Sequence, residues 1–148
     1  GFLDMTYESW DDAIDRNMNI TFNVTKEVMP FMVDAGYGRI VNVSSVTGPI
    51  VSNPGEASYS AAKAGVVGLS RALAIEFGSK GITVNCVAPG PTQTGWIDSE
   101  FEKQVVPLIP MGQLIQPEDI SDTILFLASK RARMLTGQII KVSGGHAL

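Results

Sequence analysis

The chain has 148 residues, of which 45% are hydrophobic and 18% are charged, so we expect one soluble domain with a sizeable core. Its 15 acidic and 11 basic residues give a net charge of −4 without a basic stripe, and no nucleic-acid or membrane partner is predicted. No apolar run is long enough to cross a bilayer and the first residues do not resemble a secretory signal, so we expect a cytoplasmic protein.

The first elements in chain order are a long helix and a buried strand. Apolar residues recur at three- and four-residue steps over residues 6–35, which predicts a helix that Pro30 kinks or divides. The β-branched run at residues 39–44 predicts a strand buried on both faces. Prolines and glycines in residues 49–55 predict a loop that leads to the next helix.

That next helix runs to about Ser79 and carries a stripe of small residues. Glycine inside a soluble helix costs about 1 kcal/mol relative to alanine, so two glycines in one stripe predict the close approach of a neighbouring backbone. We expect this neighbour to be another helix, either in this chain or in a partner subunit. The stripe consists of Ala61, Gly65, Gly68 and Ala72.

The second half of the chain predicts two more strands and one more helix. Gly81 is a helix-ending signal, and residues 82–88 form another buried strand. Residues 89–113 predict a tight loop followed by a mobile flap. Pro117 opens a helix, and residues 137–145 form a last strand and a glycine turn. This order predicts an α/β fold with a parallel sheet and helices on its faces.

Tyr59 and Lys63 predict an acid/base site on the helix that follows the loop. Residues four apart lie on one helix face, so the Lys63 ammonium and the Tyr59 phenol can reach the same small volume. A phenol exchanges protons poorly near neutral pH unless a nearby positive charge favours its phenolate, and Lys63 can supply that charge. Taken alone, the pair also fits an exposed aromatic residue beside an ordinary solvated lysine.

Four other residues have alternative interpretations. Ser44 and Ser45 end a predicted strand, where serine is common without any catalytic role. Asn17 also fits a polar position on a helix surface. Cys86 lies in an apolar run and is predicted to be a buried, inert thiol.

Four blocks in order resemble the short-chain dehydrogenase/reductase family, and together they span nearly the whole chain. The blocks are residues 38–45 (GRIVNVSS), 59–65 (YSAAKAG), 81–90 (GITVNCVAPG) and 136–138 (TGQ). The resemblance implies the C-terminal half of a doubly wound, Rossmann-like parallel sheet with flanking helices. It makes residues 1–148 a single partial domain, the catalytic half of such an enzyme.

The resemblance also implies a reaction, in which a ketone is reduced, or a secondary alcohol oxidised, with NADP or NAD. A 3-oxoacyl thioester is the implied substrate. Tyr59 would exchange the proton, Ser45 would hold the substrate oxygen, and Lys63 would promote the phenolate and bond the nicotinamide ribose. Asn17 would hold a water that links Lys63 to solvent.

By the same resemblance, the loop after the second strand would line the nicotinamide side together with Tyr59 and Lys63. Trp96 to Met111 would then close over the substrate. No metal site is predicted, because the lone His146 has no partner at metal-ligand spacing. The cofactor-lining loop residues are Pro89, Gly90, Thr92 and Thr94.

The glycine loop that binds the cofactor phosphates in this family does not occur in these 148 residues. We therefore expect weak cofactor binding by this chain alone, and an unpaired sheet edge on the strand at residues 40–43 that favours aggregation. The alternative function is a catalytically silent chain that keeps only the oligomerisation surfaces of the family. In either case the helical faces predict a homodimer or homotetramer.

Overall fold

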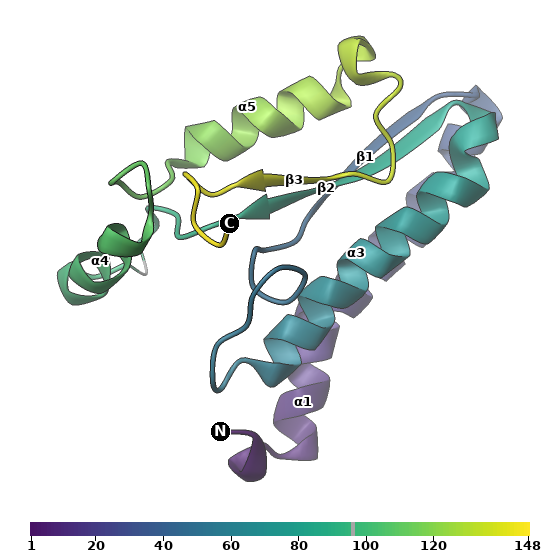
Figure 1. Cartoon of the computed structure of the whole chain (residues 1–148). Coiled ribbons are helices and arrows are strands. Elements are labelled where there is room, and N and C mark those ends of the chain that lie inside the picture. The colour runs from purple at the N-terminus through teal and green to yellow at the C-terminus, as the bar shows by residue number, and fades with distance from the viewer. Residues whose placement is uncertain (96) are drawn as a thin grey trace.

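The computed structural model describes residues 1–95 and 97–148 and has a parallel α/β fold, as predicted. Three parallel strands lie in the order β1, β2, β3, with α5 on one face of the sheet and α2 and α3 on the other (Figure 1). The elements are α1 (Tyr7–Ile14), α2 (Ile20–Ala35), β1 (Gly38–Val43), α3 (Ala57–Phe77), β2 (Ile82–Pro89), α4 (Ser99–Val105), α5 (Pro117–Ala128) and β3 (Ile139–Val142).

The central strand β2 organises the core. Ile82 and Val84 pack against α2 and α3, whereas Val87 packs against Leu127 of α5 on the opposite face. Residues 82–88 are all buried, which confirms a strand covered on both faces. Cys86 is 0% exposed, and burial raises the pKa of its thiol, so the prediction of a buried thiol is confirmed.

The first helical segment is continuous, and it contains an irregularity that the sequence did not predict. A capping box begins α1, in which the Thr6 hydroxyl accepts a hydrogen bond from the Ser9 backbone N–H at 3.1 Å. A π-helical turn, Asp15–Asn19, then joins α1 to α2. Pro30 lies inside α2 without dividing it, so the predicted division at the proline is wrong. The π turn occurs instead where the chain passes α3.

The small-residue stripe of α3 is only partly explained inside this chain. A Cβ placed on Gly65 would meet Met18 Sδ at 2.6 Å, so the close neighbour there is a side chain of the π turn and not a backbone. A Cβ on Gly68 would meet nothing within 4 Å. The buried face of α3 lies on the other side and is formed by Ala62, Val66, Val67, Ser70 and Ala74.

The segment between β2 and α5 is more regular than the predicted flap. It contains α4 and a 3-10 turn, Val106–Leu108. Val105 and Ile109 are buried together with Leu114 and Ile115, so this segment has its own apolar cluster. Trp96, the first residue of the predicted flap, lies outside the described residues.

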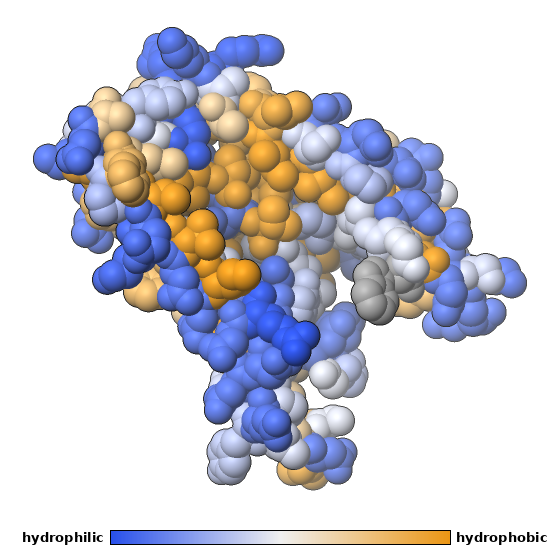
Figure 2. Space-filling view, turned by 180° about the vertical axis from the view of Figure 1, so that it is seen from behind, coloured by the Kyte–Doolittle hydropathy of each residue, from blue (hydrophilic) through white to orange (hydrophobic). Residues whose placement is uncertain are grey.

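Among the described residues, β1 pairs with β2 only, so its other edge carries no strand. In the view from behind, where α2 and β1 come nearer to the viewer, hydrophobic side chains gather over the middle of the molecule (Figure 2). In the part of the chain that the structure describes, none of the helices is long and apolar enough to cross a membrane.

Candidate active site

A cavity of about 740 Å³ opens beyond the carboxyl ends of the strands, on the side where α4 and the C-terminus lie (Figure 1). Ligands of open α/β sheets bind at this edge. Four of the residues predicted from the sequence line it together: Ser45, Tyr59, Pro89 and Gly90. The other lining residues include Asn53, Glu56, Ile97, Phe101, Gln104, Val105, Leu108 and His146.

Ser45 stands just after β1 with its hydroxyl proton free for a ligand. Its Oγ accepts a hydrogen bond from the Thr47 backbone N–H at 3.1 Å, which fixes the side chain. An oxygen that accepts this bond can still donate its own proton to an atom in the cavity.

Ser44, its neighbour, has a structural role that the sequence did not reveal. It is buried, and its hydroxyl donates to the Lys63 carbonyl oxygen at 2.9 Å. The Lys63 ammonium in turn donates to the Val43 carbonyl oxygen at 3.2 Å. These two bonds tie the end of β1 to the first turns of α3, and they set Ser45 and Tyr59 at the same cavity.

Tyr59 and Lys63 lie as the helical spacing predicted. The Lys63 Nζ is 5.6 Å from the centre of the Tyr59 ring, and both side chains are half-buried. The ammonium therefore adds positive potential where the phenol would give up or receive a proton. Three N–H donors belong to this ammonium and one of them serves Val43, so two can serve a ligand.

Burial lowers the pKa of the Lys63 ammonium below its ordinary value of 10.5. Between the lowered value and 10.5 the unfolded chain binds more protons than the native one, so stability rises with pH across this window. We expect Lys63→Met to remove that rise, while the exposed control Lys80→Met keeps it. Unfolding midpoints measured at a series of alkaline pH values check this, and an unchanged slope in Lys63→Met would contradict it.

Asn17 lies in the π turn, which packs against α3, but it does not line the cavity. Its amide donates to the Ala13 carbonyl oxygen at 3.0 Å. The structure thus brings Asn17 to the helix that bears Tyr59 and Lys63, and among the described residues it has no hydrogen bond to either side chain.

Thr92 and Thr94 come after the lining residues Pro89 and Gly90 in the sequence, but they do not line the cavity themselves. The Thr92 hydroxyl donates to the Gly90 carbonyl oxygen at 2.8 Å, and its backbone bridges to Ile115. Thr94 is exposed. A nicotinamide cofactor fits the donors present, because the Tyr59 hydroxyl has no partner among the described residues and Lys63 has free N–H groups.

The far wall of the cavity was predicted only in part. It combines apolar residues of the segment before α5, which was expected to close over a substrate, with His146, which follows β3 and was not expected here. No local pattern signals the place of His146, because it depends on the pairing of β3 beside β2. In the described residues, no group of three or more His, Cys, Asp and Glu side chains could hold a metal ion.

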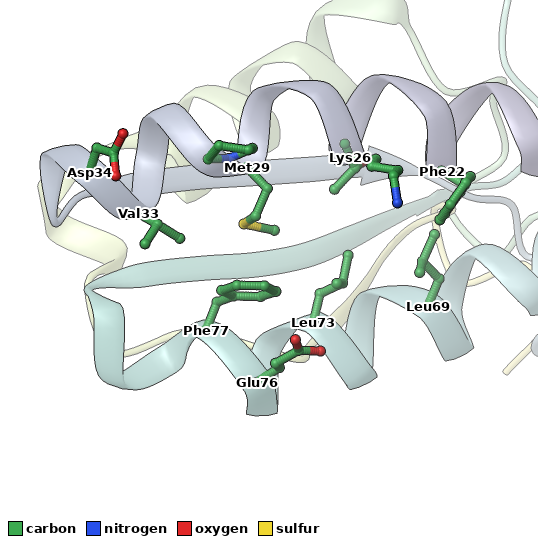
Figure 3. A pocket seen from close by; sticks show the side chains of 11 residues that line it. Phe22, Lys26, Met29, Val33, Asp34, Leu69, Leu73, Glu76 and Phe77 are labelled. Carbon is green, nitrogen blue, oxygen red and sulfur yellow. The ribbon is translucent and has the colours of Figure 1, made fainter.

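A second cavity, of about 530 Å³, lies between α2 and α3 and contains none of the predicted catalytic residues (Figure 3). Met29, Val33, Leu73 and Phe77 point into it from the two helices. Charged side chains also line this cavity, namely Lys26, Asp34 and Glu76.

A parallel α/β sheet with a serine, a tyrosine and a nearby lysine at the carboxyl ends of its strands defines a Rossmann-like protein with a candidate ligand cavity at that edge. A family model described as "Enoyl-(Acyl carrier protein) reductase" matches residues 1–147. The chain belongs to the short-chain dehydrogenase/reductase family, which confirms the resemblance inferred from its sequence.

Known relatives are similar over nearly the whole chain. A 3-oxoacyl-[acyl-carrier-protein] reductase of Staphylococcus aureus is 44% identical over 144 residues, which are 95% of this chain and 58% of the relative. The nodulation protein G of Azospirillum brasilense is 40% identical over 147 residues, or 97% of this chain and 59% of that protein. The chain thus spans a little under three fifths of the length of these relatives.

Solved structures show the same fold. A Brucella melitensis 3-oxoacyl-[acyl-carrier protein] reductase with bound NAD matches with a TM-score of 0.89 and 37% identity, covering 99% of this chain and 55% of that one. A putative gluconate dehydrogenase from Agrobacterium tumefaciens matches with a TM-score of 0.93 and 30% identity, covering 99% of this chain and 59% of that one.

Proposed function

We propose that the protein carrying this chain reduces a ketone to a secondary alcohol with NADH or NADPH, and that its substrate is a 3-oxoacyl thioester. The observation that carries this proposal is the shared cavity of Ser45 and Tyr59, with the Lys63 ammonium 5.6 Å from the tyrosine ring. Family membership supports the reaction class.

The proposed chemistry uses each side chain once. The bound cofactor supplies a hydride to the carbonyl carbon. Tyr59 donates its phenolic proton to the carbonyl oxygen. The hydride on carbon and this proton on oxygen together convert the ketone into the alcohol. Ser45 donates a hydrogen bond to the same oxygen, and this bond strengthens as negative charge develops there. Lys63 stabilises the phenolate that remains and hydrogen-bonds the nicotinamide ribose.

Three further roles complete the proposed site. Asn17 holds a water through which Lys63 exchanges protons with solvent. Pro89 and Gly90 border the nicotinamide, and Thr92 and Thr94 contact the carboxamide and the phosphate side. Family membership supports these proposed roles, and the position of Asn17 against α3 is compatible with them.

The shape of the cavity supports an acyl substrate. Ile97, Phe101, Val105 and Leu108 form an apolar wall opposite the hydroxyl groups. An acyl chain can lie along this wall while its ketone oxygen faces Ser45 and Tyr59. Relatives that are named 3-oxoacyl-[acyl-carrier-protein] reductases support the same substrate class.

The test is a turnover assay on the natural protein at its full length. A short 3-oxoacyl thioester is supplied with NADH or NADPH, and the loss of the reduced cofactor is followed by absorbance. We expect saturable turnover with at least one of the two cofactors. A protein that binds the cofactor but reduces neither this thioester nor a simple ketone would overturn the proposal.

The alternative function is assembly without catalysis, and the apolar face of α2 and α3 favours it. Phe22 is 46% exposed there, and Val33, Leu69, Leu73 and Phe77 line the same cavity (Figure 3). We propose that a second copy of the same chain covers this face, because Lys26 on α2 can pair across a twofold axis with the acidic Asp34 or Glu76 of the other copy. Absent turnover with intact assembly would favour this alternative.

Gly68→Ala tests the assembly. In an isolated chain this change should stabilise α3 by about 1 kcal/mol, because a Cβ at Gly68 meets nothing within 4 Å. Against a packed second copy, the added methyl should weaken association by about tenfold. Sedimentation and light scattering over a concentration series measure this, and Gly78→Ala, at the end of α3, is the matched control. Unchanged association in Gly68→Ala, or a strictly monomeric parent, would count against the interface.

A further inference from the structure

His146 lines the catalytic cavity, and its imidazole has no hydrogen-bond partner within the described residues. The ring nitrogen Nδ1 is buried. A buried polar atom without a partner costs about 1–3 kcal/mol, and such atoms are rare unless a ligand or water completes them. Because Nδ1 is enclosed, a molecule in the cavity would bond the imidazole through its other nitrogen, Nε2.

Two other polar side chains that line the cavity already have partners. Glu56 accepts a hydrogen bond from the Asn53 amide at 2.8 Å, and the Gln104 amide donates to Glu100 at 3.3 Å. Among the described lining residues there is no lysine or arginine. On this side of the cavity, His146 is therefore the basic side chain that a polar substrate group would meet.

The backbone holds His146 in place. Gly144 and Gly145 have positive φ angles of 59° and 90°, and a Cβ on either would come within 2.8 Å of Ile109 or Pro110. The His146 backbone N–H donates to the Ser143 carbonyl oxygen at 2.9 Å. Ala147, which follows, is the one residue other than glycine with a positive φ in the described chain. The turn therefore packs closely against Ile109 and Pro110, and this packing fixes the position of His146 at the cavity wall.

We propose that His146 is a specificity-determining residue, which donates a hydrogen bond from Nε2 to the second carbonyl oxygen of the substrate, the thioester oxygen. Ser45 and Tyr59 hold the ketone oxygen at the same time. Two separate anchors select 3-oxoacyl thioesters over ketones with a single oxygen. This inference rests on the proposed reductase function.

Two substrates measure the selectivity on the full-length protein. One is a short 3-oxoacyl thioester, and the other is the matched ketone in which a methylene replaces the thioester carbonyl. We expect His146→Leu to lower the ratio of their kcat/KM values by about tenfold, mainly through a higher KM for the thioester. His146→Gln retains a donor and should recover part of the ratio. Gln138→Leu, which removes an exposed side chain that has its own partner outside the cavity, is the control. An unchanged ratio in His146→Leu would overturn the inference.

A binding experiment separates this inference from the proposed function. His146 is the only histidine of the 148 residues, so its imidazole signal in ¹⁵N-histidine-labelled protein is assigned by its loss in His146→Gln. We expect the thioester to shift this signal in a Tyr59→Phe background, and the matched ketone to shift it much less. Turnover without the shift would refute the role of His146 alone, whereas the shift without turnover in the parent would refute the reductase alone. Equal shifts with both compounds would also overturn the inference.

Discussion

Tyr59→Phe is expected to lower kcat for ketone reduction by about 10³-fold or more, because general acid catalysis contributes roughly 10²–10⁴ and phenylalanine has no proton to give. The KM should change little, since the ring remains and Ser45 still bonds the ketone oxygen. Steady-state rates on the full-length protein measure the effect. Tyr7→Phe is the matched control, because Tyr7 is 92% exposed and does not line the catalytic cavity.

The division between kcat and KM distinguishes this role from a merely structural one. Loss of a packing residue would lower stability and change both constants, whereas loss of a proton donor lowers kcat with the fold intact. A Tyr59→Phe protein that unfolds at the parental temperature and keeps a rate within a few-fold of the parent would remove Tyr59 from the acid/base role.

Gly48→Ala is expected to lower the free energy of unfolding by about 3–5 kcal/mol, the second large effect. Gly48 has a φ of 103°, and a Cβ there would collide with the backbone carbonyl of Ser60. Neither the left-handed backbone nor the carbonyl can yield cheaply, because Ser60 belongs to the first turns of α3. The helix start would have to move, and Tyr59 would move with it, so kcat should fall as well.

Gly55→Ala separates the two causes. Gly55 also has a positive φ, of 85°, but a Cβ there would meet nothing within 4 Å. It should therefore cost only the backbone strain, about 1–2 kcal/mol, and leave kcat near that of the parent. Denaturant titrations of both variants give the comparison. Equal losses in the two would show that the contact between Gly48 and α3 carries no stability.

The sequence predicted the elements whose signal is local. β-branched residues in β1 and β2 and the long apolar periodicity of α3 do not depend on distant neighbours. The sequence missed α4, although Asp98 caps it by accepting from the Glu100 and Phe101 backbone N–H groups. That N-cap signal was available, but the prolines on either side of the helix outweighed it.

Features that depend on tertiary contacts could not be predicted from the sequence. The π turn at Asn17 forms where Met18 meets Gly65 of α3, a contact that no residue pattern encodes. In the site, the spacing of Tyr59 and Lys63 was sufficient because one helix sets it. His146 enters the cavity only because the sheet brings β3 beside β2, and a lone histidine near a chain end has no sequence signal of its own.

Substitutions in the two halves of α3 should alter the protein in cells in different ways. Its first turns bear Tyr59 and Lys63 and are tied to β1 by hydrogen bonds, whereas its last turns contribute Leu73, Ala74 and Phe77 to the apolar core. Changes in the last turns reduce the folded fraction and hence the amount of protein that escapes proteolysis. Substitution of the half-buried Tyr59 or Lys63 in the first turns should leave abundance near normal and reduce the activity of each molecule. Measured side by side, abundance and specific activity should therefore change in opposite halves of this one helix.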